Sequence, residues 1–401
     1  MAKIKKEEIS INNSTKVNKN FLAELIKDTD MMMASESTSM NSILRPKVKH
    51  PLWVINCLCG GGIPMSLQTE FCGQPSSGKT TGAYTMLSNY LRDNPNGVGV
   101  IIDMEGSMDN SRLINLGVDV NRVIRQPAQS LENGFGNMFR IFTKLKEAKE
   151  KIPEISVMVV FDSISSSGTD KQHQTAEEGN SVYGSGPILE TPRILKQNTA
   201  NVFPFIEDLP ILIVYINQVS TVGIGTYAPK IDSVGGWAFK HNMQFSLIYG
   251  VPKDIYEDGF IVSTKCNVDV KKSKIAPKFI DIPCVVSANG GTIDEVGSFL
   301  EYLALSNVGI IKIGSYYSIK ETIDLMVEQY PILKDNEKLM SYYKSIRRAD
   351  LYKMVREDED MQKLLQIRLI DFIDEKYPLQ RDINDGYQKE LIKSCSYFNS
   401  K

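Results

Sequence analysis

The stretch that decides the fold of this chain reads Gly73-Gln74-Pro75-Ser76-Ser77-Gly78-Lys79-Thr80. It matches the pattern G-x-x-x-x-G-K-[ST], whose glycines let backbone N–H groups turn inward around phosphate oxygens. A chance match in a chain of this length is on the order of one in a hundred. The apolar run LQTEFC (67–72) before it suits a strand, and an amphipathic helical pattern follows it. We therefore predict a P-loop that binds ATP, rather than a glycine-rich turn without a ligand.

The parts of this loop have separate expected roles. The Lys79 ammonium would reach the terminal phosphates and take part in catalysis, and the Thr80 hydroxyl would bind Mg²⁺. The residues expected to hold the nucleotide are consecutive: Gly73, Gln74, Pro75, Ser76, Ser77, Gly78, Lys79, Thr80 and Thr81.

Further apolar runs follow the loop, separated by helical patterns. They are VGVIIDM (98–104), VMVVF (157–161) and ILIVYI (211–216). Apolar strands that alternate with helices indicate a parallel sheet covered on both faces, so the expected fold class is α/β with a mostly parallel sheet. After Gly235 the strand patterns become shorter, as in MQFSLIYG (243–250), and suit antiparallel strands at a sheet edge.

Composition divides the chain into three expected parts. Residues 1–50 are polar and read as an N-terminal extension that serves oligomerisation, residues 51–297 as the core, and residues 298–401 as a small α-rich C-terminal domain. The formal net charge of −2 argues against binding nucleic acid through the whole surface. Five lysines and a single aspartate between Lys265 and Lys278 nevertheless concentrate positive charge locally.

The chain also lacks the marks of a membrane or secreted protein. Its apolar runs are far shorter than the ~20 residues that span a bilayer, and its polar N-terminus has no apolar core of a secretory signal. The six cysteines are scattered, without a C-x-x-C pair, and read as reduced thiols. We expect a cytoplasmic protein of a bacterial or phage-infected cell, without a membrane partner.

Polar residues at the ends of the predicted strands are the next candidates, because the carboxyl ends of parallel strands meet at one edge where ligands bind. Asp162 would hold Mg²⁺, although strands also end in aspartate as a turn residue. Glu105 would face the γ-phosphate and orient or deprotonate the attacking water, unless it is a surface residue of the loop. Asn217 and Gln218 end the 211–216 strand, where an amide can sense the γ-phosphate; a turn-forming asparagine fits equally well.

The order of these motifs resembles the RecA family of homologous recombinases. GQPSSGKTT, IIDMEGSMD, VVFDS, YINQV, SVGGWAFK and KKSKIAP occur in the family's order over roughly residues 67–286. The divergent flanks fit phage-type members such as the UvsX recombinases. The resemblance implies a RecA-like P-loop ATPase core that uses ATP and Mg²⁺. It also implies a helical filament of copies on single-stranded DNA, which pairs that strand with homologous duplex DNA and exchanges strands.

The resemblance carries roles to single residues. Glu105 takes the place of the catalytic glutamate, Asp162 that of the Walker B aspartate and Gln218 that of the γ-phosphate sensor. Lys272 and Lys274 resemble a pair that reaches the neighbouring subunit's ATP. Ser165–Pro187 and Val219–Ser233 match the two DNA-binding loops, the second expected to be mobile. The residues expected at the DNA are Arg193, Val219, Ser220, Gly235, Gly236 and Trp237.

Two departures from the family pattern stand out. Arg112 occupies the position of an aromatic residue that stacks on adenine, and its guanidinium plane can stack there instead. His241 replaces an aromatic residue at the subunit boundary. Two other functions remain open at this point. One is a hexameric DNA helicase with the same ATPase core, and the other is a DNA-coating mediator protein with a vestigial site.

Overall fold

The structure is a computed structural model that describes residue 27 and residues 45–106, 108–166, 168–178, 190–222 and 230–398. The predicted extension 1–50 therefore lies largely outside the described residues. So do residues 179–187 of the first predicted DNA loop and residues 223–229 of the second.

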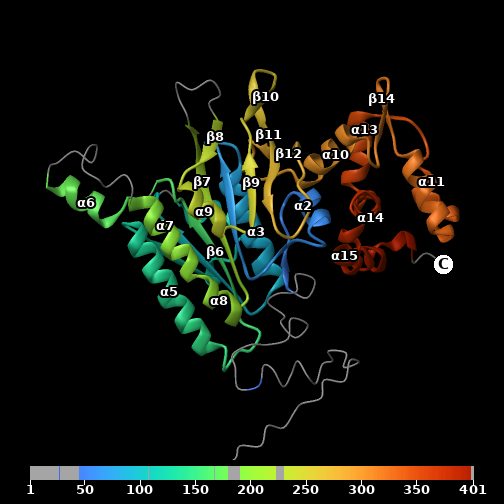
Figure 1. Ribbon diagram of the computed structural model, residues 1–401. Coiled ribbons are helices and arrows are strands. Elements are labelled where there is room, and N and C mark those ends of the chain that lie inside the picture. Colours follow the sequence, from blue (N-terminus) through green and yellow to red (C-terminus); the bar gives the residue numbers. More distant parts are fainter. Residues whose placement is uncertain are drawn as a thin grey trace, which may run out of the picture.

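A ten-stranded sheet forms the centre of the molecule, in the order β10-β11-β9-β3-β7-β6-β4-β5, with β12 paired to β11 and β8 to β7 (Figure 1). Its strands are β3 (Leu67–Gly73), β4 (Gly97–Asp103), β5 (Val123–Pro127), β6 (Ser156–Asp162), β7 (Ile211–Val222), β8 (Lys230–Ser233), β9 (Phe245–Tyr249), β10 (Lys253–Glu257), β11 (Phe260–Ser273) and β12 (Ile282–Ser287). Two small sheets join β1 (Lys47–Val48) to β2 (Ile63–Pro64), and β13 (Ile311–Ile313), β14 (Tyr316–Ser318) and β15 (Ile346–Arg347) to one another.

Helices cover both faces of the large sheet and build the C-terminal part. They are α2 (Trp53–Leu58), α3 (Lys79–Asp93), α4 (Asn110–Asn115), α5 (Leu131–Ala148), α6 (Asp170–Glu177), α7 (Glu190–Asn201), α8 (Phe203–Asp208), α9 (Gly236–Asn242), α10 (Glu295–Ser306), α11 (Lys320–Gln329), α12 (Glu337–Met340), α13 (Arg348–Arg356), α14 (Glu359–Lys376) and α15 (Arg381–Ser394). Short 3-10 turns are η1 (Val120–Arg122), η3 (Pro331–Asp335), η4 (Pro378–Gln380) and η5 (Ser396–Phe398).

The apolar runs predicted as strands are the buried centre of this sheet. Strands β3, β7, β6, β4 and β5 pair in parallel, and every residue of β3 and β6 is buried. Alternate side chains of β6 enter different cores: Val159 packs with α5 and α7, whereas Val160 packs with α3. Because both faces are covered, the strands need apolar residues at every position. The α/β fold with a mostly parallel sheet is confirmed.

One expectation about the sheet edge was wrong. Strand β9, the predicted MQFSLIYG strand, pairs in parallel with β3 and antiparallel only with β11. It therefore lies inside the sheet, beside the strand that leads into the P-loop. The antiparallel edge begins with β11, whose partners β10 and β12 are both antiparallel.

The C-terminal helices share a hydrophobic core with the sheet. Leu58 of α2, Phe299 of α10 and Leu365 of α14 belong to the same cluster as the residues under α3. Helix α10 also crosses the predicted boundary between residues 297 and 298. The three-part division of the chain stays a prediction. Within the described part of the chain, none of the helices combines the length and the apolar character that a bilayer crossing requires.

Candidate functional site

The predicted P-loop connects β3 to α3. Gly78 precedes the first helical residue with a φ of 89°, a left-handed conformation that suits glycine. A Cβ on Gly73 would lie 2.7 Å from the carbonyl oxygen of Tyr249 in β9. The two glycines of the motif are therefore required by backbone conformation at one end of the loop and by close strand packing at the other.

The residues of this loop fit a bound triphosphate. Helix α3 begins without a side-chain cap, so the N–H groups of its first turn are available to an anion. The buried Ser77 hydroxyl has no hydrogen-bond partner within the described part of the chain. The Lys79 ammonium donates to the Gln74 carbonyl within the loop, at 3.2 Å. Burial lowers the pKa of Lys79, and the nearby carboxylates of Asp162 and Glu105 oppose that shift.

Sheet register brings the predicted residues from four strands to one edge. Gln218 on β7 pairs with Gly73, the first residue of the P-loop. Asp103 on β4 pairs with Asp162 on β6, and Glu105 follows two residues after Asp103. The carboxyl ends of these parallel strands thus surround the start of α3, as the rule for open α/β sheets requires.

Asp162 is tied to helix α3. The Tyr84 hydroxyl donates to its Oδ2 atom at 2.9 Å. Burial raises the pKa of Asp162 to about 6, and the bond from Tyr84 acts in the opposite direction. Mg²⁺ next to Thr80 would favour the ionised carboxylate. Tyr84 was not predicted; it lies on the buried face of the helix, where an apolar role would be the default.

Glu105 is exposed at the edge of this site and is held by two serines that the sequence analysis missed. The hydroxyls of Ser163 and Ser166 donate to the same Oε1 atom, at 2.8 and 2.7 Å. Both bonds go to Oε1, so within the described residues the Oε2 atom is the one available for a water molecule. The serine-rich run directly after Asp162 was the available signal.

Arg112 lies beside the nucleotide loop, as the resemblance implies. Its guanidinium donates to the Thr81 hydroxyl at 2.9 Å, one residue after the predicted Mg²⁺ ligand. A Cβ on Gly291 would come within 3.3 Å of the same guanidinium. The side chain is thus placed at the mouth of the loop, between α4 and the segment that follows β12.

The two amides at the end of the predicted sensor strand have different surroundings. Asn217 is fully buried and donates from Nδ2 to Glu70 Oε1 at 2.8 Å and to the Val234 carbonyl at 2.7 Å. Its Oδ1 atom accepts from the backbone N–H of Gln218 at 2.9 Å. Gln218 is half-buried beside Gly73. Asn217 therefore orders β7 beside the P-loop strand, which leaves Gln218 as the candidate sensor.

The two ends of the second predicted DNA-binding loop are strands that pair with each other, β7 and β8. Strands β7 and β8 pair antiparallel from Val219–Ser233 to Val222–Lys230. Val219 is half-buried, and the backbone of Ser220 pairs with Asp232. Residues 223–229 of this predicted loop, between the two strands, lie outside the described residues.

The remaining DNA candidates gather where α9 begins. Gly235 and Gly236 have φ values of 106° and 74°, and a Cβ on Gly236 would lie 3.5 Å from Pro192 of α7. Arg193, the next residue, is exposed. Trp237 is 78% exposed, and its ring packs on its helix neighbour His241, with 5.5 Å between ring centroids. The first predicted DNA loop contains α6, a helix that its sequence did not predict.

Lys272 and Lys274 lie away from their own P-loop. Lys272 pairs with Ser246 near the start of β9, whereas Gly73 pairs with Tyr249 at its end. The Lys272 ammonium donates to the carbonyls of Lys240 and His241 at the end of α9. Lys274 is exposed. A role of this pair toward a neighbouring copy stays a prediction.

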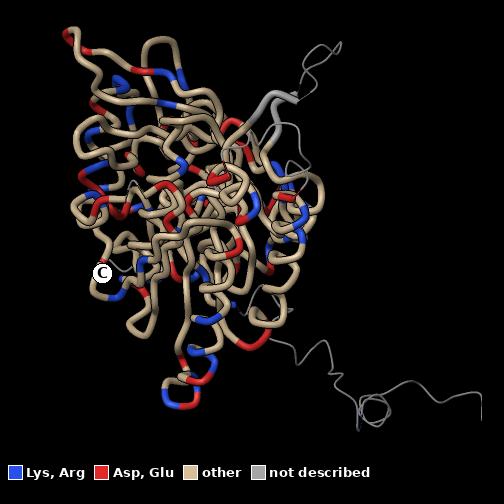
Figure 2. Tube along the Cα trace, turned by 90° about the vertical axis from the view of Figure 1, so that its left-hand side faces the viewer, with Lys and Arg blue, Asp and Glu red and all other residues tan. Residues whose placement is uncertain are grey.

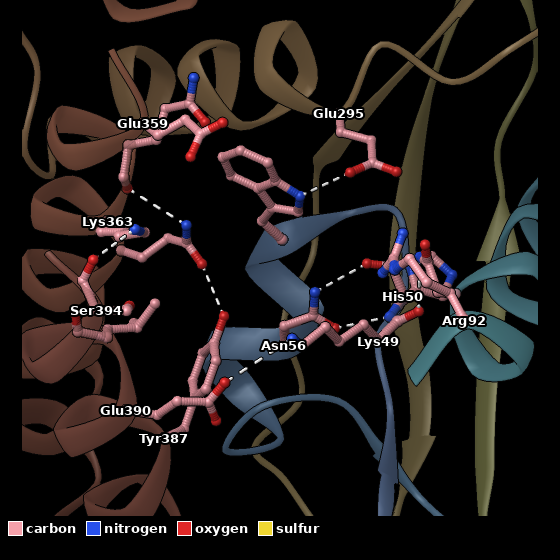
Figure 3. Close-up of a pocket in the computed structure, with 15 residues that line it drawn as sticks. Lys49, His50, Asn56, Arg92, Glu295, Glu359, Lys363, Tyr387, Glu390 and Ser394 are labelled. Atoms are coloured by element: carbon pink, nitrogen blue, oxygen red, sulfur yellow. Dashed lines mark hydrogen bonds and ion pairs between the residues drawn. The ribbon is translucent and has the colours of Figure 1, made fainter. Parts of the chain in front are cut away.

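A cavity of about 340 Å³ elsewhere in the molecule contains none of these residues. Figure 3 shows it between α2, the end of α3 and helices α14 and α15. Lys49 and Arg92 line it together with Glu295 and Glu390. Its mixed charges give no preference for phosphate. Basic and acidic residues are likewise interspersed along the described part of the trace in Figure 2.

Comparison with known proteins assigns the family. The family model for the RecA N-terminal domain matches residues 49–291. Protein RecA of Clostridioides difficile (strain 630) is 29% identical over 268 residues, which cover 65% of this chain and 70% of that protein. Protein RecA of Clostridium tetani (strain Massachusetts / E88) is 28% identical over 286 residues, covering 70% and 75%.

A longer match extends further along the chain. Protein RecA of Chlorobaculum tepidum (strain ATCC 49652 / DSM 12025 / NBRC 103806 / TLS) is 24% identical over 317 residues, covering 78% of this chain and 79% of that protein. The residues that the family model matches include the P-loop, the strand-end carboxylates and strands β7 and β8. Since the family model alone matches more than half of its length, the chain belongs to the RecA family of homologous recombinases.

Proposed function

We propose that this chain is an ATP-dependent recombinase that forms a helical filament on single-stranded DNA, pairs that strand with homologous duplex DNA and exchanges strands. The observation that carries the proposal is the position of β7. This strand places Gln218 beside the first residue of the P-loop and then continues into the hairpin with β8. A group that contacts the γ-phosphate and a loop that contacts DNA would thus be parts of one strand.

The nucleotide site would work through this chain's own residues. Lys79 and the first-turn N–H groups of α3 would bind the phosphates, while Thr80 and Asp162 would hold Mg²⁺. When bound, Mg²⁺ neutralises charge that develops on the phosphate oxygens. Glu105, oriented by Ser163 and Ser166, would accept a proton from the attacking water. Arg112 would lie against the base.

Filament assembly would complete the site. Lys272 and Lys274 would reach the nucleotide of the adjacent copy and stabilise charge on the transferring phosphoryl group, as an arginine finger does. Exposed Trp237 and Arg193 would lie at the DNA together with Val219, Ser220, Gly235 and Gly236. Because contacts would go mainly to phosphates, DNA binding should tolerate sequence changes and weaken as salt rises.

The decisive experiment combines ATPase assays with electron microscopy. With single-stranded DNA and a non-hydrolysable ATP analogue, we expect helical filaments; closed rings that unwind forked duplexes would identify a helicase instead. Single-stranded DNA should stimulate ATP hydrolysis, and DNA binding without any hydrolysis would favour the mediator function.

The Lys79→Ala variant should reduce the rate of ATP hydrolysis at least about 100-fold, because the phosphates lose the lysine cation that contacts them. Lys146→Ala, which removes an exposed lysine of α5, should hydrolyse ATP at the parental rate. Circular dichroism should be the same for both variants and the parent. Hydrolysis by Lys79→Ala at the parental rate would contradict the assignment of the P-loop.

A further inference from the structure

Glu70 is a buried carboxylate at the centre of the sheet that no predicted function uses. It lies on β3, three residues before the P-loop, and is only 4% exposed. Its neighbours Asn217 on β7 and Ser246 on β9 come from the strands on either side. A carboxylate in such surroundings is costly unless hydrogen bonds satisfy its oxygens.

The hydrogen bonds of Glu70 join four strands. Asn217 Nδ2 donates to Oε1 at 2.8 Å, and the Ser246 hydroxyl donates to Oε2 at 3.3 Å. The Ser233 hydroxyl, at the end of β8, is a third hydrogen-bond partner. One carboxylate therefore connects β3, which leads into the P-loop, with β7, β8 and β9.

The charged groups facing Glu70 come from the same region. Lys240 on α9 and Lys272 on β11 both act electrostatically on the carboxylate. Burial nevertheless dominates and raises the pKa of Glu70. Lys272 in turn donates to the last carbonyls of α9, the helix that begins with Gly236 and Trp237. The surroundings of Glu70 thus include Lys272, proposed to reach the neighbouring nucleotide, and the charge of Lys240 on α9, the helix that begins with residues proposed to meet DNA.

We propose that Glu70 is a positioning residue that couples the nucleotide site to the β7–β8 hairpin, which carries the second predicted DNA-binding loop. The proposal rests on the function proposed above and adds the connection between its two sites. A displacement of Gln218 toward or away from the P-loop moves Asn217, the preceding residue of the same strand. Asn217 Nδ2 is shared between Glu70 and the Val234 carbonyl, which directly follows β8. The position of Gln218 therefore decides how the base of the hairpin is held.

A second hydrogen bond at the base of the β7–β8 hairpin runs from the Val234 N–H to the Gln218 carbonyl, at 3.2 Å. Without the Glu70 carboxylate, the Asn217 Nδ2 group would donate to Val234 alone of its two acceptors, and Asn217 would lose its link to the P-loop strand. The nucleotide-dependent position of Gln218 would then no longer be transmitted. Coupling between two ligands is measured as the factor by which one changes the affinity for the other.

The test compares single-stranded DNA affinity in two nucleotide states. A fluorescent oligonucleotide is titrated in Mg²⁺ with a non-hydrolysable ATP analogue and again with ADP, and the ratio of the two Kd values is the coupling factor. Glu70→Met keeps the length of the side chain but removes its hydrogen bonds, and should reduce this factor at least about fivefold. Glu70→Gln keeps hydrogen-bonding oxygen and nitrogen atoms and should retain most of it.

The matched control lies on the same strand and the same face. Gln68 is buried and hydrogen-bonds to Thr199 and Tyr215, outside the Glu70 network. Gln68→Met should lower the unfolding temperature and leave the coupling factor unchanged. A purely structural role of Glu70 would instead make Glu70→Met and Gln68→Met behave alike.

Three outcomes separate the inference from the proposed function. A parental coupling factor in Glu70→Met overturns the role of Glu70 and leaves the recombinase proposal intact. A parent chain that shows no nucleotide-dependent DNA binding overturns both. If Glu70→Met does not fold, Ser246→Ala removes a single arm of the network. It should lower the factor about two- to threefold, and an unchanged factor overturns the role of Glu70.

Discussion

At the scale of residues, the candidate site depends on how each carboxylate is held. Glu105 is exposed and receives two serine hydroxyls on one oxygen, whereas Asp162 is buried and receives a single tyrosine hydroxyl. The two surroundings suit different tasks. An exposed, oriented carboxylate can exchange a proton with water, and a buried one beside Thr80 can bind a cation.

The Glu105→Gln variant should bind ATP and single-stranded DNA. It should hydrolyse ATP at least about 100-fold more slowly than the parent, because an amide cannot accept the proton. Single-turnover hydrolysis and nucleotide titration separate the two effects. Glu147→Gln, an exposed substitution on α5, is the control that should hydrolyse at the parental rate. A parental rate in Glu105→Gln would remove Glu105 from the catalytic role.

His50 makes stability depend on pH. Burial lowers the pKa of His50 to about 3, and its Nδ1 atom accepts from the Leu52 N–H at 3.0 Å. The unfolded chain binds a proton near pH 6.5, but the folded chain does not. The contribution of His50 is therefore present above about pH 6.5 and is lost as the pH falls toward 3. The loss at pH 5 amounts to about 2 kcal/mol.

The matched variant is His50→Asn, whose carbonyl can still accept from Leu52. Its free energy of unfolding, measured in urea from pH 7 to pH 5, should fall less steeply with decreasing pH than that of the parent. Equal slopes would show that His50 is already protonated in the folded chain, or is not buried there.

At the scale of elements, helix α3 is attached to strand β6 at two points. Tyr84 donates to Asp162 at the carboxyl end of the strand, and Tyr90 shares a 2.8 Å hydrogen bond with Ser156 at its other end. Both tyrosines are buried. One contact reaches the predicted Mg²⁺ ligand and the other does not, although both join the same two elements.

Replacing these tyrosines separates attachment from metal binding. Tyr84→Phe should raise the Mg²⁺ concentration for half-maximal ATP hydrolysis by roughly tenfold, because a hydrogen bond to a charged group contributes about 1.5 kcal/mol. Tyr90→Phe should lower the free energy of unfolding by a similar amount, about 1.5 kcal/mol, without changing the Mg²⁺ requirement. The same Mg²⁺ requirement in both variants would contradict the role of Tyr84.

At the scale of the whole molecule, the C-terminal helices are packed into the core. Gln380 donates to the Leu58 carbonyl at 2.7 Å, and the Tyr387 hydroxyl donates to Gln366 at 2.8 Å. Leu58, Phe299 and Leu365 lie in the same cluster as the residues beneath α3. A continuous apolar core couples the unfolding of the elements that share it.

Calorimetry of the full chain should therefore show one unfolding transition that includes both the sheet and the C-terminal helices. Addition of ATP with Mg²⁺ should shift the whole transition to higher temperature, since a ligand that binds only the folded state stabilises everything coupled to it. Two separate transitions, with only one shifted by nucleotide, would instead identify residues 298–401 as an independent domain.

The fold class and the P-loop could be predicted because their signals are local. Uninterrupted apolar strands reveal a sheet buried on both faces, and a phosphate loop needs glycine, lysine and threonine at adjacent positions. Asp162 and Gln218 could be placed at the same edge because parallel strands share a direction. The serine-rich run that holds Glu105 is a weaker signal, and the tyrosine that holds Asp162 gives none, because serine and tyrosine are common in turns and helices.

Sequence alone thus identified the family of this chain and the strand-to-helix loop that carries the P-loop motif, since both reside in short contiguous motifs. Strand order and register were settled only by folding, because they depend on contacts between residues far apart in the chain. Glu70 and Asn217 are 147 residues apart and meet only when β3 and β7 pair. The parallel position of β9 has the same cause: pairing across the sheet, and not the local pattern of a strand, selects its neighbour.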